Sequence, residues 1–294
     1  MFKTVLVHLS GTDCDQSVLP TALRLVKPLG GHLDCVRVVP DQAALVAQAV
    51  QIDLGSAMLL SDTINTIEQH ARERTERARA TFADFCKRHD LPQVASPPGP
   101  GSVTASWREI PAADEYEAVT EIARFHDIAV LAGGKERSGR LPAEYLGSIV
   151  ISAGRPVVLA PEKARDGDIK RIAVAWKNTA EAARALTAAM PLLAQAHRVD
   201  VLSVSEGDSA IEQCLDCSDS VVRQLRWHGL NAQPHLIVPA GRTPPDAVLE
   251  SAHGLGADVL VMGAYGHSRL REFVFGGFTQ RILKGADLPV FLFH

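Results

Sequence analysis

The chain has 294 residues, 46% of them hydrophobic, and its 34 acidic and 30 basic side chains give a net charge of −4. This length suits two α/β domains better than one, and the balanced charge excludes the global basic field that favours nucleic-acid binding. Residues 1–10 hold an apolar run too short for a membrane span or a secretory signal, so we expect a cytoplasmic protein with no membrane partner. The odd number of cysteines, five, does not predict a disulfide framework.

The first predicted strand and helix occur twice. An apolar strand at residues 4–9 is followed by a polar turn and then by apolar residues at helical spacing, and the same order recurs from residue 171. Each copy continues into a second apolar strand, at residues 33–39 in the first and at residues 199–204 in the second. The chain is therefore predicted to be a tandem repeat of one β/α unit.

Landmarks later in the two copies also match. Residues 127–134 parallel residues 257–263, and residues 152–160 parallel residues 285–293. Each half is thus predicted to contain about five strands. Apolar strands that alternate with helices favour a parallel sheet covered by helices on both faces.

Residues 161–168 form a polar stretch with Pro and Gly, which is the composition of a linker. We place the boundary between the two copies near residue 165. The predicted domains are residues 1–162 and residues 168–294.

The two copies differ in length at one place. Thr12 and Thr179 are 167 residues apart, whereas Gly147 and Gly276 are 129 apart, so the first domain carries 38 extra residues. Most of them must lie within residues 41–100, after the second strand.

Two helices are predicted in this insertion, at residues 43–52 and 65–89, and the second is strongly charged on its exposed side. The pattern is typical of a long surface helix with an apolar lid segment, and a dedicated partner site is the alternative. Pro and Gly at residues 96–101 then end the helix before the third strand.

A glycine loop at residues 261–279 is the most informative segment of the chain. A run of apolar residues ends in Gly263, two residues separate it from Gly266, and nine more lead to Gly276 and Gly277. Glycines allow the backbone to approach a ligand closely, and the free N–H groups at a helix start attract anions, so the pattern indicates a phosphate site. The alternative is that these glycines only permit a tight connection from a strand to a helix.

The spacing Gly-x-x-Gly, nine residues, then Gly and a small residue, followed by residues 281–293, closely resembles the signature of the universal stress protein family. The resemblance implies two flavodoxin-like domains in tandem, each a doubly wound five-stranded parallel sheet of the adenine nucleotide alpha hydrolase-like type. It also implies an intramolecular pseudo-dimer, in which the last strands of the two halves, at residues 156–159 and 289–293, pair with each other. Such pairing would remove two sheet edges that could otherwise aggregate.

In this family the glycine loop wraps the phosphates of ATP, and the resemblance therefore implies ATP or a related nucleotide, with or without Mg²⁺, in the second domain. The amides from Gly277 onward would hold phosphate oxygens, and Thr279 would add a hydroxyl. The site residues implied are Met262, Gly263, Gly266, His267, Gly276, Gly277, Phe278, Thr279, Ala175, Trp176 and Val204.

Two positions depart from the family pattern. Gly277 replaces the usual Ser or Thr, which removes one hydrogen bond worth ~0.5–1.5 kcal/mol and leaves the amide donors in place. At the end of the first strand of each half, where members that bind ATP commonly have Asp, this chain has Ser10 and Lys177. Lys cannot accept a hydrogen bond from an adenine amino group, so Trp176 and Lys177 would instead stack on a base or meet a phosphate, or Trp176 would simply pack.

The first domain departs further. When Gly147 and Ser148 are aligned with the later glycines of the loop, Gly134 takes the place of the first glycine and Arg137 that of the second, and Pro142 interrupts the segment between. The first site is therefore predicted to be degenerate, and one nucleotide per chain is expected in the second domain.

No residue is predicted to be catalytic and no metal ligands are predicted. The Cys214-x-x-Cys217 pair lies ten residues beyond a strand, where a helix interior is expected, and has no partner His or Cys pair to complete a zinc site. Nucleophile-elbow and lysine P-loop motifs do not occur, so ATP turnover, if any, should be slow.

We therefore expect a stress-response protein that binds ATP or a related nucleotide and has a regulatory or protective role toward a protein partner not identified by the sequence. The alternative, favoured by Lys177, Ser10 and Arg137, is a nucleotide-free scaffold that acts through protein contacts. A redox protein on the same fold is the third hypothesis, and only the cysteine pair supports it. Association of two chains into a homodimer stays open.

Overall fold

The computed structural model describes residues 2–41, 43–44, 57–96, 101–133, 141–205, 211–266 and 277–294. Within these residues the strands are β1 (Thr4–His8), β2 (His32–Pro40), β3 (Thr104–Ala112), β4 (Ile128–Ala132), β5 (Val157–Ala160), β6 (Arg171–Ala175), β7 (Arg198–Val204), β8 (Ala232–Ile237), β9 (Val259–Gly263) and β10 (Val290–Phe293). The helices are α1 (Asp15–Val26), the 3-10 helix η1 (Lys27–Leu29), α3 (Ala57–Arg88), α4 (Glu115–Ala123), α5 (Ala143–Ser152), α6 (Ala180–Leu193), α7 (Ile211–Trp227), α8 (Pro244–Gly254) and α9 (Gly277–Leu283).

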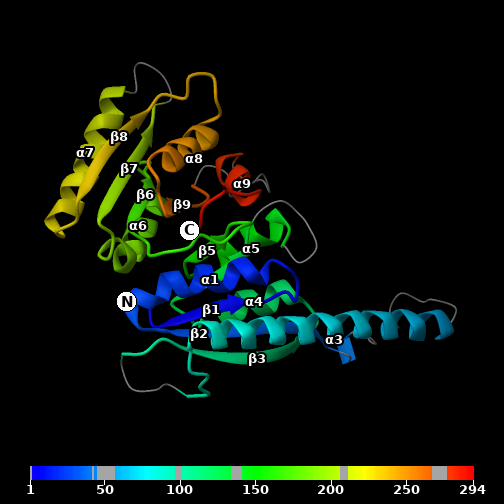
Figure 1. The fold of residues 1–294 in the computed structure, drawn as a ribbon. Helices are drawn as coiled ribbons and strands as arrows, with labels where there is room; N and C mark the ends of the chain where they lie inside the picture. Colours follow the sequence, from blue (N-terminus) through cyan, green and yellow to red (C-terminus); the bar gives the residue numbers. More distant parts are fainter. Residues whose placement is uncertain are drawn as a thin grey trace.

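The described strands form one ten-stranded sheet in the order β3-β2-β1-β4-β5-β10-β9-β6-β7-β8 (Figure 1). The neighbours within β1 to β5 and within β6 to β10 run parallel. Each half therefore has the doubly wound order that the sequence predicts, and the fold class is confirmed. The predicted domain limits separate the two sets of strands, although independent folding of each domain stays a prediction.

The two halves join through their last strands. β5 and β10 pair antiparallel, with Phe291 opposite Val158 and Val290 opposite Leu159. This confirms the predicted pairing of residues 156–159 with residues 289–293. Because the pairing is antiparallel, the carboxyl ends of the two half-sheets point in opposite directions at the junction.

Helices cover both faces of the sheet, as the alternation of strands and helices predicts. Residues of α1, α3, α6 and α7 share one buried cluster, and residues of α4, α5, α8 and α9 share the other. Successive strand residues alternate between the clusters: Val5 and Val7 lie on the α1 side and Leu6 on the α4 side. This alternation is the period of two expected for a strand that is buried on both faces.

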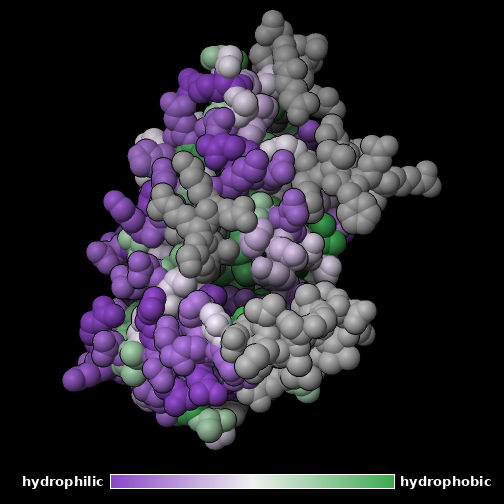
Figure 2. Space-filling view, turned by 90° about the vertical axis from the view of Figure 1, so that its right-hand side faces the viewer, coloured by the Kyte–Doolittle hydropathy of each residue, from purple (hydrophilic) through white to green (hydrophobic). Residues whose placement is uncertain are grey.

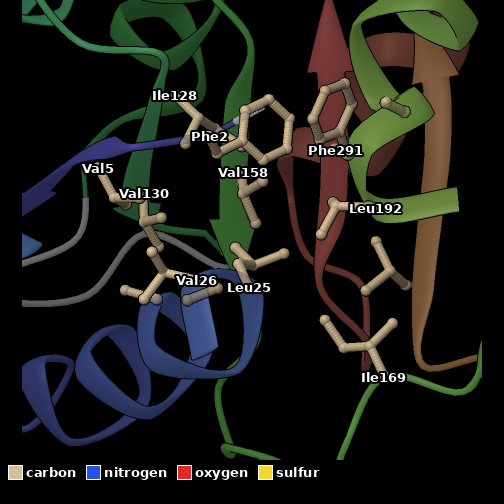
Figure 3. Packing of buried hydrophobic residues seen from close by; sticks show 14 of the residues in the cluster. Phe2, Val5, Leu25, Val26, Ile128, Val130, Val158, Ile169, Leu192 and Phe291 are labelled. Atoms are coloured by element: carbon tan, nitrogen blue, oxygen red, sulfur yellow. The ribbon is translucent and has the colours of Figure 1, made fainter. Parts of the chain in front are cut away.

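Phe2 and Phe291 connect the cores of the two halves on the α1 side. Their ring centroids are 6.2 Å apart, and Figure 3 shows the rings facing each other beside Val158. Phe291 is fully buried and Phe2 is 5% exposed. The apolar core is therefore continuous across the junction.

An ion pair also ties the halves together at the linker. The side chain of Arg24 on α1 donates to the carbonyl oxygen of Gly167 at 2.7 Å and to a carboxylate oxygen of Asp258 at 3.1 Å. Ile169, which follows the linker, is buried in the α1-side cluster. The segment predicted as a linker is thus held against both halves.

Helix α3 differs from its prediction. It begins at Ala57, earlier than the predicted residue 65, and Figure 1 shows that it projects beyond the ends of β1, β2 and β3. Its later turns are not merely a surface helix, because Phe82 and Phe85 are each only 2% exposed and pack against the sheet. The helix predicted at residues 43–52 lies outside the described residues, apart from residues 43–44.

The surface of the described residues is mostly polar. The face drawn in Figure 2 is predominantly hydrophilic, with only small and separate hydrophobic areas. None of the helices in the described ranges is long and apolar enough to span a membrane.

Candidate functional site

The strand order of the second half reverses at β6, which lies between β9 and β7. In an open α/β sheet, ligands bind beyond the carboxyl ends of the strands at such a reversal. Ala175, the last residue of β6, pairs with Met262 of β9, and the amide of Trp176 donates to the carbonyl oxygen of Leu202 on β7 at 2.8 Å. The structure thus brings four of the predicted site residues to one edge: Ala175, Trp176, Met262 and Gly263.

Val204 ends β7 at the same edge, beside the end of β6. The loop residues His267 and Gly276 of the predicted site lie outside the described residues. The two ends of the glycine loop, by contrast, are described as far as Gly266 and from Gly277.

Gly263 has a packing role. A Cβ atom built on it would lie 2.5 Å from the amide nitrogen of Ala182 and 2.6 Å from the carbonyl carbon of Glu181, both in the first turn of α6. Contacts this short with backbone atoms leave no room for a side chain. Close packing of the end of β9 against α6 therefore explains Gly263 without any ligand, and the predicted tight connection to the following helix stays a prediction.

Glu181, which the sequence interpretation missed, is a buried carboxylate beneath the glycine loop. It is 2% exposed, and a Cβ atom on Gly266 would lie 3.7 Å from its Oε2 atom. Its Oε1 atom accepts a hydrogen bond from Arg184 at 3.1 Å. A glutamate in the first turn of a helix is usually solvated and favoured by the helix dipole, so no sequence signal pointed to its burial.

Tyr265 also escaped the sequence interpretation. Its φ is +57°, a left-handed conformation that bulky residues rarely adopt, and burial raises the pKa of its hydroxyl. The loop around it is anchored to the last strand and the residue after it. The amide of Ala264 donates to Phe293 O at 2.9 Å, and His294 Nδ1 donates to Ala264 O at 3.0 Å.

The described part of helix α9 is Gly277–Leu283, and whether the helix starts there, as the glycine spacing predicts, stays a prediction. No atom of the described residues lies within 4 Å of a Cβ built on Gly277. Phe278 packs against the α4-side cluster, and Thr279 is 5% exposed. The burial of Thr279 means that its hydroxyl is less accessible to a ligand than the sequence suggests.

Two buried donors at this edge lack hydrogen-bond partners among the described residues. They are Nε1 of Trp176 and Oγ of Ser203, which lies on β7 one residue before Val204. Trp176 packs against the α1-side cluster, which agrees with the packing alternative for its ring, but its N–H stays unsatisfied. Since buried polar groups are nearly always paired, these two atoms fit a site that takes a polar ligand.

The first half does not reproduce this geometry. Gly147 and Ser148, which the glycine spacing aligned with the start of α9, lie inside α5, which begins at Ala143. The hydroxyl of Ser148 donates to Glu144 O at 3.1 Å. The predicted alignment of these glycines is therefore wrong as a structural equivalence, and the first turn of α5 carries the acidic residue Glu144. Gly134 and Arg137 lie outside the described residues.

The cysteine pair lies inside α7, as the sequence predicts, and Cys217 is half-buried. The side chain of Cys214 is outside the described part of the structure. No group of three or more potential metal ligands occurs among the described residues.

These features define a doubly wound α/β protein with a candidate ligand site at the carboxyl ends of β6 and β9, where the strand order reverses. The model of the universal stress protein family matches residues 231–294. The universal stress protein Slr1230 of Synechocystis sp. is 24% identical over 308 aligned residues, which cover 99% of this chain and all of that protein. The chain is therefore similar to universal stress proteins over nearly its whole length, and the family model itself matches its last part.

Solved structures show the same fold. A universal stress protein from Archaeoglobus fulgidus covers 99% of this chain with a TM-score of 0.68 at 15% identity, and 97% of that chain is covered. The protein PA1789 from Pseudomonas aeruginosa gives a TM-score of 0.56 at 14% identity, with 99% of this chain and 92% of that chain covered. A universal stress protein solved in complex with cAMP covers 42% of this chain with a TM-score of 0.33, too low to bear on a ligand here.

Proposed function

We propose that this chain is a universal stress protein that binds ATP or a related nucleotide at the edge formed by β6, β7, β9 and α9, and that occupancy regulates a protective role under stress. The observation that carries the proposal is the pair of buried, unpartnered donors, Trp176 Nε1 and Ser203 Oγ, at the point where the strand order reverses. A nucleoside offers the ring nitrogens and hydroxyl oxygens that would accept from such donors.

The start of α9 would receive the phosphates. The first amides of a helix have no partner within the helix, and no atom of the described residues would obstruct an anion at Gly277. Lys177, exposed at the end of β6, adds positive charge on the same edge. The buried carboxylate of Glu181 would favour a hydroxyl or amino group of the ligand on its side and disfavour phosphate there.

Mg²⁺, if bound, would arrive with the nucleotide phosphates and be held by them, because Mg²⁺ commonly uses substrate phosphates as ligands. The residues proposed for the site are assigned to binding, and no catalytic role is assigned to Glu181 or His267. The proposal is therefore binding and not rapid hydrolysis.

The matched pair Trp176→Phe and Trp227→Phe tests this site. Phe keeps most of the apolar ring and removes the indole N–H, and the second tryptophan is 86% exposed at the end of α7. The loss of one hydrogen bond predicts an affinity for ATP about 2- to 12-fold weaker for Trp176→Phe and unchanged for Trp227→Phe. Isothermal titration calorimetry measures both.

No binding of ATP, ADP or AMP to the unmodified chain at millimolar nucleotide would refute the proposal and leave the scaffold hypothesis. Equal affinities for the two variants would move the site away from Trp176. A homodimer would have to use a surface other than β5 and β10, because those two strands already pair within the chain. Light scattering with and without ATP would decide whether occupancy changes association.

A further inference from the structure

The corresponding edge of the first half is filled by the protein itself. The order β3-β2-β1-β4-β5 reverses at β1, so the general rule places a ligand crevice beyond the carboxyl ends of β1 and β4, where the loop after His8 lies. In that loop Ser10 and Gly11 are buried. The equivalent residues after β6, Lys177 and Asn178, are exposed.

Helix α3 is what covers this loop. A Cβ atom on Gly11 would overlap the carbonyl group of Arg74, so the backbones of the loop and of α3 are in direct contact. Nε of Arg74 donates to the carbonyl oxygen of Ser10 at 2.8 Å. Its counterpart in the second half, α7, has 17 residues where α3 has 32.

The loop amides that could otherwise face a ligand are also satisfied internally. The carboxylate of Asp15, which is 1% exposed, accepts from the amide of Ser10 at 2.8 Å and from the amide of Gly11 at 2.9 Å. The hydroxyl of Ser10 pairs with that of Thr12 at 2.7 Å. The amides of Ser10 and Gly11 and the hydroxyls of Ser10 and Thr12 thus all have partners within the protein.

Large polar side chains fill the space beside the loop. The strand registers equate His8 with Ala175 and Arg37 with Ser203. His8 and Arg37 are each 3% exposed, and both donate at 3.0 Å to Oε1 of Glu115 at the start of α4. At the same two positions the second half has a methyl group and an unpartnered hydroxyl.

We propose that α3 and this buried ionic cluster, formed by His8, Arg37 and Glu115, act as a built-in occupant of the first crevice. Helix α3 is a strap that closes the first half, so the chain has one open edge instead of two. The closure is independent of the proposed nucleotide, and only the number of ligands per chain rests on the proposed function.

Hydrogen–deuterium exchange of the intact chain tests the closure without any ligand. The amides of Ser10 and Gly11 should exchange at least about tenfold more slowly than those of Lys177 and Asn178, because the former are buried and bonded to a carboxylate. Equal exchange rates in the two loops would overturn the proposal.

The variant Gly11→Ala and its control Gly154→Ala test the part played by α3. Both glycines have left-handed φ values, +73° and +60°, so both substitutions strain the backbone, but Gly154 has no neighbour within 4 Å. Gly11→Ala should speed exchange in the turn of α3 that contains Arg74 by at least about tenfold, and Gly154→Ala should not. Equal effects of the two substitutions on α3 would overturn the strap.

Repeating the exchange experiment with added ATP, together with a measurement of the ATP bound per chain, tests the number of ligand sites. One ATP per chain, with slowed exchange around residues 176–180 and at the start of α9 but not at residues 9–13, is the expected result. ATP that also slows exchange at residues 9–13, with two bound per chain, would overturn the proposal. ATP that slows exchange at neither loop would count against the proposed function alone, because the ligand-free rates and the glycine pair still decide the closure.

Discussion

Replacing Phe291 by Ala should destabilise the whole chain, because this side chain packs where the two halves meet. Phe291 is fully buried on β10, opposite Val158 of β5, with the ring of Phe2 at 6.2 Å. Figure 3 shows that the β10 ring faces residues of both halves. The substitution leaves the backbone pairing of β5 and β10 in place and removes only the ring.

The expected loss is about 3–5 kcal/mol in the free energy of unfolding, the range for Phe→Ala in a well-packed core. About 0.5–1.5 kcal/mol of that amount would come from the pairing of the two rings. The total is a large fraction of the roughly 5–15 kcal/mol that stabilises a typical folded protein. The variant Phe125→Ala is the control, because that side chain is 84% exposed and should change stability by less than about 0.5 kcal/mol.

Urea unfolding followed by circular dichroism measures both variants, and the double variant with Phe2→Ala isolates the ring pair. A continuous core predicts that Phe291→Ala lowers the midpoint for both halves together. A loss below about 1 kcal/mol, or a loss confined to one of two separate transitions, would refute the reasoning that the junction is part of one core.

Three further predictions concern buried charge and backbone contact. The hydrogen bond from His8 and the charge of Arg37 outweigh the effect of burial and lower the pKa of Glu115 to about 2. The contribution of ionised Glu115 to the free energy of unfolding is therefore present above pH ~4.5 and is lost as the pH falls toward 2. When stability is titrated against pH, the loss over this range should be smaller in Glu115→Gln than in the unmodified chain by up to about 3 kcal/mol. Gly263→Ala should lower the melting temperature, because its Cβ atom would lie 2.5 Å from the backbone of α6. The control Gly254→Ala has no neighbour within 4 Å and should leave the melting temperature unchanged or raise it. Equal melting temperatures of the two variants would contradict the close packing at Gly263. Asp200→Ala should lower the free energy of unfolding, measured by chemical denaturation, by roughly 3–5 kcal/mol, because this fully buried carboxylate pairs with two arginines and a histidine. The control Asp246→Ala breaks an exposed ion pair and should lower it by less than about 1 kcal/mol.

The central strands of the sheet could be predicted from the sequence because they are buried on both faces. Such strands appear as short apolar runs, and the runs recur in both halves in the same order. The pairing of the last strands came from the family resemblance and not from the residues themselves. The start of α3 was predicted too late because residues 57–64 lack the alternation of charges that marks the rest of the helix, although they contain no Gly or Pro to stop it.

The glycine spacing located the edge of the second half but gave the wrong equivalences in the first. β4 ends at Ala132 and β5 begins at Val157, 25 residues later, whereas β9 ends at Gly263 and β10 begins at Val290, 27 residues later. The two connections differ in length, so counting from glycine to glycine aligned a helix start with a helix interior. Spacing is a reliable guide to a loop only when the elements on either side are equally long.

Burial of Glu181 and closure of the turn at Gly11 depend on contacts between segments distant in the sequence, and local patterns do not encode them. One sequence signal was nevertheless present. Once β1 is aligned with β6 and β2 with β7, the end of the first crevice has His8 and Arg37 where the second has Ala175 and Ser203. Large charged side chains leave no volume for a ligand and small ones do. In a duplicated fold, the size of side chains at equivalent strand ends therefore separates a filled crevice from an open one, and the glycines of the loop alone do not.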